Sequence, residues 1–370
     1  MSAPSASGFA PCTVVDRQIL QRNVELAARS AADAGVALRP HAKTHKSLDI
    51  ASLQLRAGAV GLSVATVGEA EILADAAPGG GPGDLFIALP VWPGDDAAAR
   101  LRQLCERAVI TVGADSVAGI DRLAATVPAT CGLRVAVELD CGLGRTGTGA
   151  DAAAGVASAA VDAGYEVVGV FTFPGHSYRP GAAATAADDE CSALARGRAA
   201  LESAGIACPV RSGGSTPSLA DSLRLAGAGV VTELRPGVYV LNDAQQVALG
   251  TVGVDQVALW VLSRVVSAVA RDRIVLDAGS KLLGPDRPPW VAGHGLLPDH
   301  PGAVVTGLWE HHAVVDVSAC RYGRPSVGEV VRIVPNHVCS AVNLVDELLV
   351  VDGDDTVVDR WAVPARGLNG

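Results

Sequence analysis

Short apolar runs alternate with longer amphipathic stretches between Cys12 and about Gly250. Each run is rich in Val, Ala and Leu, ends in a glycine-rich or polar turn, and precedes an Ala-rich stretch with helical spacing. The strand-like runs are residues 36–43, 60–66, 84–91, 109–114, 133–140, 166–173, 208–214 and 232–240, and the helical patterns include 68–76, 97–108 and 116–127. Strands that alternate with helices in this way form parallel β-α-β units. The pattern therefore predicts an α/β fold with a closed (β/α)8 barrel, with a doubly wound open sheet as the alternative.

The pattern changes after about residue 250, where turns are frequent and helical patterns are few. The β-rich runs in this part are residues 257–270, 273–279, 310–318, 328–339 and 347–353. They predict a second, mainly antiparallel β domain. We therefore expect a barrel domain over residues 12–247 and a β domain over residues 248–370, with residues 1–11 as a candidate addition to the β domain.

The composition limits the classes of function. Because only 4 Phe, 4 Tyr and 5 Trp accompany 42 Gly, the core must consist mostly of Ala, Val and Leu in closely packed elements. The net charge of −10 and the lack of a basic patch disfavour nucleic acid and anionic membranes as partners. No apolar run approaches the roughly 20 residues of a spanning helix, and the first residues lack an export-signal pattern. With 8 scattered cysteines, reduced thiols and a cytoplasmic enzyme are expected.

Polar residues follow the ends of the predicted strands, which is where barrel enzymes place their active sites. Lys43 ends the first run and is flanked by His41 and His45. Burial and neighbouring positive charge both lower the pKa of a lysine, as a Schiff-base lysine requires. From this spacing alone, a surface lysine in a basic turn is the commoner explanation.

A glycine-rich turn over residues 213–217 opens the helical pattern that follows the seventh run. Backbone N–H groups and the dipole at such a helix start favour a phosphate, and an ordinary capped turn is equally consistent with these residues. A second glycine turn, residues 235–237, ends the next run. Because late neighbouring strands of a barrel often form a phosphate cradle, the two turns together favour phosphate binding.

His337 and Cys339 lie at the predicted end of the run 328–339. Since residues two apart on a strand face the same side, their imidazole and thiol would converge. Zn²⁺ accepts this N and S pair, but a buried pair without metal is the commoner explanation of two such residues. The pair also leaves a metal short of protein ligands, so that substrate or a further ligand must complete the shell.

Several of these segments occur in a familiar order along most of the chain. They are residues 39–46, 175–178, 213–218, 232–240, 276–281 and 335–347. With them the sequence resembles the D-serine dehydratase-like and D-threonine aldolase group of fold-type III pyridoxal-phosphate enzymes. This resemblance implies an alanine racemase-like N-terminal barrel, a C-terminal β domain and a homodimer.

The resemblance also implies a set of cofactor-binding residues. Lys43 corresponds to the lysine that holds pyridoxal 5'-phosphate as a Schiff base and is the catalytic residue. The remaining positions are Gly214, Ser215 and Thr216 at the phosphate, Gly237 and Tyr239 from the next strand, and Arg145, His176 and Tyr178 beside the ring.

His337 and Cys339 correspond to the metal pair of the dehydratases, which use zinc; Mn²⁺ or another divalent ion is the alternative. The aldolases typically carry an aspartate at the second position, so Cys339 favours the dehydratase branch. One departure leaves the substrate open. Relatives often show Glu-Glu-His-Gly before the metal strand, whereas residues 309–313 here are Trp-Glu-His-His-Ala.

The expected reaction is a β-elimination from a small D-amino acid such as D-serine or D-threo-3-hydroxyaspartate. Lys43 would remove the α-proton and the metal would stabilise the departing hydroxide, giving a 2-oxo acid and ammonia. The first alternative is retro-aldol cleavage to glycine and an aldehyde, with His45, His311 or His312 as candidate bases. A racemase is a less suitable alternative, because it needs a second base on the opposite face of the substrate and no such residue is identified in this sequence. A non-catalytic pyridoxal-phosphate-binding protein is disfavoured by the second domain and by the metal pair.

Overall fold

A computed structural model of the chain describes residues 4–76, 83–320 and 323–370. Its internal contacts divide it into two compact units. The barrel unit comprises Leu26–Lys43, Ile50–Gly237 and Leu368–Gly370, and the β unit comprises Met1–Glu25, Thr44–Asp49 and Val238–Gly367. Across the described ranges, no helix has both the length and the apolar character needed to cross a membrane.

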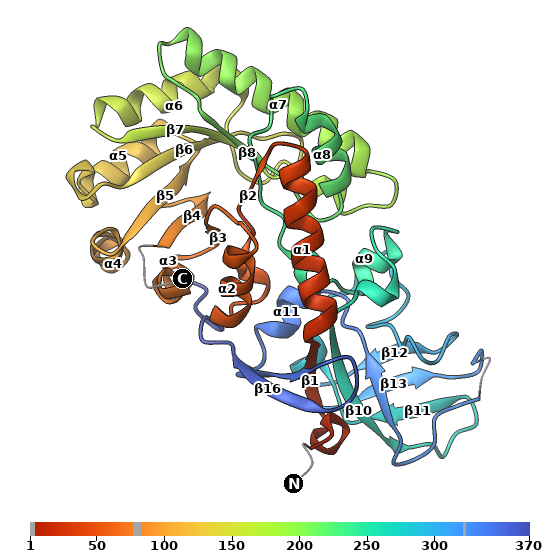
Figure 1. The fold of residues 1–370 in the computed structure, drawn as a ribbon. Helices are drawn as coiled ribbons and strands as arrows, with labels where there is room; N and C mark the ends of the chain where they lie inside the picture. Colours follow the sequence, from red (N-terminus) through yellow and green to blue (C-terminus); the bar gives the residue numbers. More distant parts are fainter. Residues whose placement is uncertain (1–3, 77–82, 321–322) are drawn as a thin grey trace. The chain divides into compact units, whose positions relative to one another are not determined.

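Eight parallel strands form the sheet of the barrel unit, in the order β2-β9-β8-β7-β6-β5-β4-β3 (Figure 1). They are β2 (Ala37–Leu38), β3 (Leu62–Val64), β4 (Gly83–Pro90), β5 (Ala108–Ala114), β6 (Arg134–Glu138), β7 (Glu166–Phe171), β8 (Val210–Gly213) and β9 (Glu233–Leu234). The two edge strands are also joined, because the Ser63 N–H donates to the Pro40 carbonyl at 2.8 Å and an isolated parallel bridge pairs His41 with Ser63. The strands therefore form a ring, which confirms the predicted barrel and excludes the open sheet.

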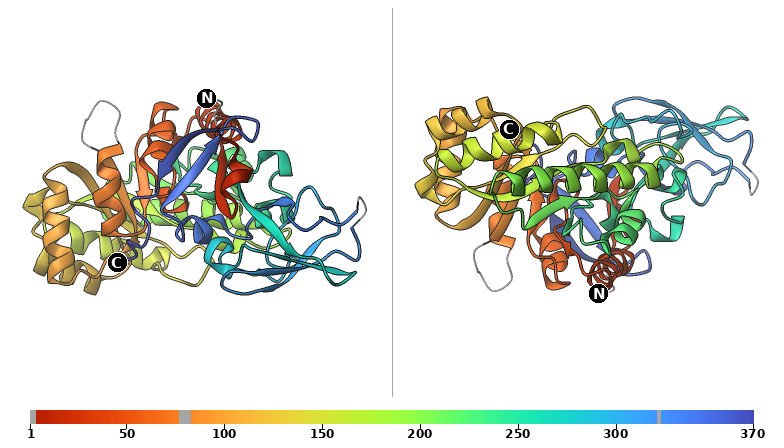
Figure 2. Two further views of the ribbon diagram at one scale, coloured as in Figure 1. Left: turned by 90° about the horizontal axis from the view of Figure 1, so that it is seen from below. Right: turned by 90° about the horizontal axis from the view of Figure 1, so that it is seen from above.

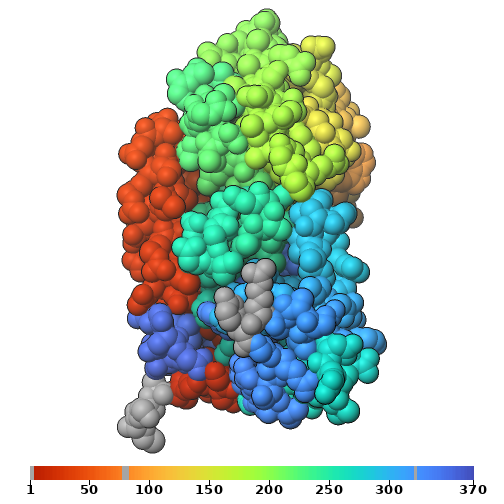
Figure 3. All heavy atoms as spheres, turned by 90° about the vertical axis from the view of Figure 1, so that its right-hand side faces the viewer, coloured from red at the N-terminus to blue at the C-terminus, as the bar shows by residue number. Residues whose placement is uncertain are grey.

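Helices lie on the outside of this ring, as the views from below and above show (Figure 2). They are α2 (Leu48–Arg56), α3 (Val67–Leu73), α4 (Asp95–Cys105), α5 (Val117–Thr126), α6 (Ala150–Asp162), α7 (Ala183–Ser203) and α8 (Leu219–Ala226), and α1 (Arg17–Asp33) belongs partly to each unit. Polar caps fix where some of them begin; the Ser116 hydroxyl, for example, accepts the Gly119 N–H at the start of α5. In the space-filling view α6 to α8, coloured yellow to green, form an outer face of the barrel unit (Figure 3).

The β unit is built on a second eight-stranded sheet whose pairs are antiparallel except for β1 with β15. Its strands are β1 (Cys12–Asp16), β10 (Leu259–Ser267), β11 (Arg273–Leu276), β12 (Val304–Leu308), β13 (Ala313–Asp316), β14 (Val330–Ile333), β15 (Glu347–Val351) and β16 (Val357–Ala362). Short helices α9 (Ala244–Ala248), α10 (Ser280–Leu283) and α11 (Val338–Val342) complete the unit. The mainly antiparallel character confirms the prediction for this part of the chain.

The division between the units differs from the predicted boundaries of 12–247 and 248–370. Residues from 12 onward were expected to belong to the barrel domain, but Val14 of β1 pairs with Trp260 of β10 and with Leu349 of β15. The β unit also begins again at Val238, before the predicted boundary. Both differences arise because long-range strand pairing, rather than the local pattern, decides which sheet a strand joins.

Candidate cofactor and metal sites

Lys43 lies in a short 3-10 turn, Ala42–Thr44, just after β2. Its Nζ is 5.8 Å from the centre of the Phe173 ring, and the Arg145 guanidinium carbon is 5.3 Å from the same ring. Two basic side chains from different strand ends thus meet on one aromatic ring, at distances that suit cation–π contacts. Phe173 was missing from the predicted site because it read as one more apolar residue of the run 166–173.

The loop that carries Arg145 is held tightly at the end of β6. The Asp140 carboxylate accepts the N–H groups of Gly142 and Gly144 at 2.9 and 3.1 Å. Gly147 has φ +104°, and a Cβ there would lie 2.5 Å from the Asp140 nitrogen, so this position requires glycine. The loop therefore presents the exposed Arg145 side chain from a fixed backbone.

The predicted phosphate turn follows β8 and is buried. Gly214 has φ +93°, and its N–H donates to the carboxylate of Glu190 on α7, so that this N–H is already engaged. The Ser215 hydroxyl lies 2.7 Å from the Ser177 hydroxyl and 2.8 Å from that of Ser218. The Gly214 N–H is therefore used within the protein, and the role of Gly214 is to let the backbone turn sharply.

Glu190 is a functional support that the sequence did not reveal, because it lies within an otherwise ordinary amphipathic helix. It is fully buried, and the Ser222 hydroxyl of α8 donates to its Oε2 at 2.7 Å. Burial raises the pKa of Glu190 above its usual value. The carboxyl group ties the Gly214 turn to both α7 and α8.

His176 and Tyr178 lie in and just after the 3-10 turn Gly175–Ser177, beyond the end of β7. The His176 Nε2–H donates to the Asp189 carboxylate of α7 at 3.2 Å, an orienting contact that sequence reasoning missed. Its Nδ1 is buried and has no hydrogen-bond partner among the residues that the structure describes. An imidazole oriented on one side and unpaired on the other is a candidate ligand contact.

Gly237 and Tyr239 lie at a unit boundary. Gly237 closes the barrel unit, whereas the buried Tyr239 belongs to the β unit in the turn Val238–Val240. Two residues before Gly237, the buried Arg235 donates to the Thr172 carbonyl at 2.7 Å. Burial lowers the pKa of this guanidinium, against the opposing effect of nearby carboxylates that include Glu233.

The structure corrects the geometry predicted for the metal pair. β14 ends at Ile333, so His337 and Cys339 are not on a strand. His337 instead precedes α11 and Cys339 lies in its first turn. Pro335 explains the difference, since proline cannot donate a hydrogen bond to a strand ladder. The two side chains nevertheless lie close together, because the Cys339 side chain raises the pKa of His337 through charge and hydrogen bonding.

The Asp243 carboxylate, at the start of α9, lies near the imidazole of this pair. Its fully buried carboxylate accepts the Val338 N–H at 3.1 Å, and its Oδ2 lies 3.6 Å from His337 Nδ1. Burial alone would lower the pKa of His337, but Cys339 and Asp243 together raise it well above its usual value. A carboxylate behind a histidine is the usual support of a metal-ligating imidazole.

His337 and Cys339, the predicted metal ligands, have few other candidate ligand side chains around them. In the described ranges, no group of three or more His, Cys, Asp or Glu side chains has the geometry to hold a metal. Cys339 Sγ lies 3.2 Å from the hydroxyl of Thr44, the residue that follows Lys43 in the chain. Such a two-residue site leaves coordination positions open for substrate or water.

The histidines proposed as bases for the aldolase alternative are arranged differently from one another. His45 is buried, and its Nδ1 accepts the Ser47 N–H at 3.2 Å. His311 and His312 are exposed between β12 and β13.

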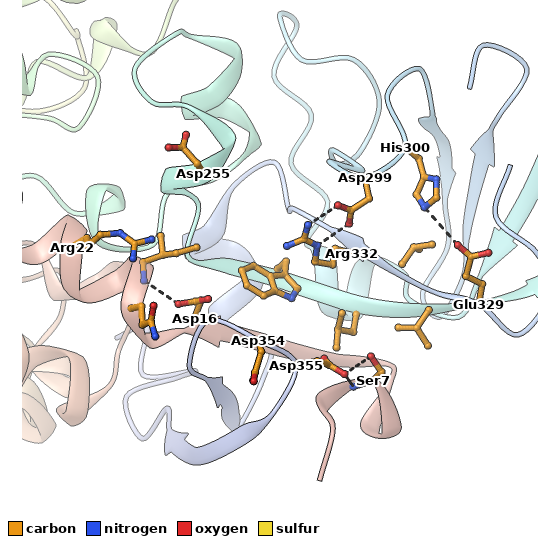
Figure 4. Close-up of a pocket in the computed structure, with 17 residues that line it drawn as sticks. Ser7, Asp16, Arg22, Asp255, Asp299, His300, Glu329, Arg332, Asp354 and Asp355 are labelled. Atoms are coloured by element: carbon orange, nitrogen blue, oxygen red, sulfur yellow. Dashed lines mark hydrogen bonds and ion pairs between the residues drawn. The ribbon is translucent and has the colours of Figure 1, made fainter. Parts of the chain in front are cut away.

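A pocket of about 820 Å³ in the β unit contains none of the predicted site residues (Figure 4). Some of its charged groups pair with one another. Arg332 pairs with Asp299 at 2.5 Å and lies over the Trp260 ring at 5.3 Å, and His300 is 3.9 Å from Glu329. The pocket thus resembles a solvated ionic surface more than a ligand site.

Comparisons with known proteins place the chain. A family model described as alanine racemase, N-terminal domain, matches residues 15–244, more than half of the chain. The chain belongs to this family. A second model, described as putative serine dehydratase domain, matches residues 258–351. The family resemblance stated from the sequence is therefore confirmed.

Individual relatives are similar to this chain over nearly its whole length. D-threo-3-hydroxyaspartate dehydratase from Delftia sp. is 33% identical over 89% of this chain and 90% of its own. D-threonine aldolase from Arthrobacter sp. is 34% identical over 99% of this chain and 95% of its own. A solved structure of a D-threo-3-hydroxyaspartate dehydratase mutant in the metal-free form has a TM-score of 0.85 at 29% identity, covering 97% of this chain and 98% of that one.

Proposed function

We propose that this chain is a pyridoxal-phosphate- and zinc-dependent lyase that removes water from a D-3-hydroxy amino acid, giving a 2-oxo acid and ammonia. D-serine and D-threo-3-hydroxyaspartate are the proposed substrates. The proposal is supported by the relatives, which are named as a dehydratase and an aldolase of D-hydroxy amino acids. The observation that carries the choice of dehydratase is the thiol of Cys339 beside His337.

The residues of the barrel unit fit pyridoxal phosphate. Lys43 would hold the cofactor, and Ser215 and Thr216 would bind its phosphate next to Gly214, Gly237 and Tyr239. The unpaired, buried Nδ1 of His176 offers a polar contact to the ring, with Arg145 and Tyr178 beside it. When bound, the cofactor withdraws electrons from the substrate Cα and makes its proton acidic.

The chain itself supplies the base and its surroundings. The Lys43 amine is the group that takes the α-proton, and its Nζ lies 5.8 Å from the centre of the Phe173 ring. Asp189 holds His176 in one orientation. Arg145 places a positive charge over the Phe173 ring as a partner for anionic groups of the ligand.

His337 and Cys339 fit a zinc ion, with Asp243 behind the imidazole. A thiolate is a soft ligand, which favours zinc over Mn²⁺ or another divalent ion. The ion would supply Lewis acidity at the substrate hydroxyl. Retro-aldol cleavage needs instead a base that deprotonates this hydroxyl. His45 already uses its Nδ1, and His311 and His312 are exposed, so elimination is the better fit.

The test is a product analysis. Purified protein is incubated with D-serine, D-threo-3-hydroxyaspartate and D-threonine, with and without a chelator, while 2-oxo acid, ammonia, glycine and aldehyde are measured. We expect 2-oxo acid and ammonia in equal amounts, lost on chelation and restored by zinc. Aldehyde with glycine as the main products would establish the aldolase instead. Inversion of the α-carbon alone would indicate a racemase, and cofactor binding without turnover a non-catalytic binding protein.

The assembly and location are part of the proposal. We propose a homodimer in the cytoplasm, and light scattering of the purified protein tests the dimer. The cytoplasm is supported by the cysteines, since no disulfide joins any of those in the described residues.

A further inference from the structure

A buried carboxylate stands at the end of β6, where the Arg145 loop begins. Glu138 is the last residue of this strand and is 2% exposed. Its Oε1 accepts the Thr146 hydroxyl at 2.9 Å, whereas its Oε2 is buried without a hydrogen-bond partner among the described residues. A buried carboxylate oxygen that lacks a donor is unfavourable, so a purely structural role does not account for its presence.

Positive charges compensate this carboxylate only in part. Burial raises the pKa of Glu138, while the Thr146 hydroxyl and the guanidinium groups of Arg145 and Arg235 act in the opposite direction. No ion pair joins Glu138 to either arginine within hydrogen-bond reach in the part of the chain that the structure describes. The carboxylate therefore acts on Arg145 through charge and through the loop.

Two hydrogen bonds attach the loop to Glu138, both from residues that follow Arg145 in the chain. Thr146, which donates to the carboxylate, is the next residue after Arg145. The Thr148 N–H donates to the Glu138 carbonyl at 2.9 Å, and Leu139 and Thr148 form an isolated parallel bridge. Because both attachments fix the backbone next to Arg145, they determine where its guanidinium can rest, which is over Phe173.

We propose that Glu138 is a positioning residue for Arg145: its charged carboxylate holds the loop and keeps the guanidinium over Phe173, on the ring that Lys43 also contacts. The inference rests on the proposed function, since it assigns Glu138 to the same cofactor site. It goes beyond the predicted site, in which Arg145 had no support. This role accounts for a buried carboxylate whose Oε2 lacks a hydrogen-bond donor among the described residues.

The alternative is that Glu138 is only a hydrogen-bond anchor for Thr146. The substitution Glu138→Gln separates the two, because the amide oxygen of glutamine still accepts the Thr146 hydroxyl but carries no charge. A mere anchor would tolerate this change. If the charge of Glu138 positions Arg145, Glu138→Gln should lower function in the protein that contains Arg145 and should have no effect in the Arg145→Ala background.

The experiment is a double-mutant cycle with Glu138→Gln, Arg145→Ala and the double variant. Three quantities are measured: the Kd of the apoprotein for pyridoxal phosphate, kcat/KM for 2-oxo acid formation, and the Tm of the apoprotein at pH 8. We expect Glu138→Gln to weaken cofactor binding or kcat/KM by about 10-fold or more, as loss of outer support commonly does. The double variant should match Arg145→Ala, and the Tm of Glu138→Gln should equal or exceed that of the wild type.

Glu69→Gln is the matched control. Glu69 is also 2% exposed, and its Oε2 accepts the Ala65 N–H at 2.7 Å at the start of α3, in the same unit. This variant should lower Tm and leave the cofactor Kd unchanged. The inference is overturned by wild-type Kd and kcat/KM in Glu138→Gln, by additive effects in the double variant, or by an equal loss of cofactor affinity in Glu69→Gln. A wild-type protein that neither binds the cofactor nor turns over substrate would overturn the proposed function itself.

Discussion

Both units have apolar cores, but the barrel unit buries more acidic and basic side chains than the β unit does. The β unit has an apolar core of Val, Ile, Leu and Ala from β10, β11, β13, β14 and their neighbours. The interior of the barrel unit also contains buried charges. Arg39 lies 2.7 Å from Glu233 and 2.8 Å from Asp84, while Glu138 and Glu190 are buried beside the candidate cofactor residues.

This difference indicates which side chains chiefly stabilise the protein and which chiefly serve its function. Apolar burial stabilises a unit roughly in proportion to its area, whereas buried charges gain little and are costly when incompletely paired. Groups such as Glu138, with an unpartnered oxygen, therefore mark the part of the barrel shaped for a ligand. We expect substitutions in the β unit core to change stability, and substitutions of the polar groups in the barrel unit to change activity.

The largest effect should follow Lys43→Ala. Loss of the base is expected to lower kcat/KM by about 10³-fold or more, and the visible absorbance of lysine-bound pyridoxal phosphate should vanish. The Tm of the apoprotein should be unchanged. Steady-state kinetics and an absorbance spectrum measure both, with Lys281→Ala, an exposed lysine of the β unit, as the control. An absorbance band that survives in Lys43→Ala would refute the cofactor assignment.

The next effect concerns the apolar core of the β unit. Leu276 is fully buried, so Leu276→Ala should lower the free energy of unfolding by about 2–5 kcal/mol. Its kcat/KM, measured per folded molecule, should remain that of the wild type. Val269→Ala, at a side chain that is 96% exposed, should change stability by less than about 0.5 kcal/mol. Urea unfolding gives these values; a lower kcat/KM with normal stability would break the comparison.

Asp243 is a fully buried carboxylate of the β unit, whose core is otherwise mainly apolar. Because it supports His337, Asp243→Asn should weaken zinc binding by about 10–100-fold. Competition with a chelating dye measures the affinity. Asp346→Asn, at an exposed aspartate of the same unit, is the control. Unchanged zinc affinity in Asp243→Asn would remove the orienting role assigned to this carboxylate.

The smallest effect is a pH dependence of stability from Glu190. Burial raises its pKa in the folded state above the ordinary value of 4.5, against the opposing effects of Ser222, the Gly214 N–H and Arg235. The protonated form therefore favours folding, and this contribution is present below about pH 4.5 and is lost as the pH rises through the folded-state pKa. Glu190→Gln should gain Tm relative to the wild type between pH 5 and pH 8. A constant difference across this range would contradict the expected sign.

The fold was largely predictable because its signals are local. Each of the eight apolar runs became a barrel strand, since such runs must be buried between helices. β1 could not be assigned in this way. Its short apolar pattern suits either sheet, and only its pairing with β10 and β15 places it in the β unit.

The candidate site was predictable only at residues whose side-chain type itself indicates a chemical role, such as lysine, histidine and cysteine. Lys43, His337 and Cys339 stand out in the sequence, although Pro335 and the start of α11 were not recognised as the end of the strand. Phe173 and Glu138 gave no such signal, because an aromatic or acidic residue at a strand end is common. Their roles follow from contacts between segments that are distant in sequence.

The central claim is that the chain eliminates water from a D-3-hydroxy amino acid with the help of a metal. The most direct test is to quantify oxaloacetate, ammonia, glyoxylate and glycine formed from D-threo-3-hydroxyaspartate by the purified, cofactor-loaded protein before and after chelation, because oxaloacetate is the 2-oxo acid of elimination and glyoxylate is the product of cleavage. We expect 2-oxo acid with an equal amount of ammonia, abolished by the chelator and restored by zinc. Glyoxylate with glycine as the products, or 2-oxo acid formation that is insensitive to chelation, would contradict the account.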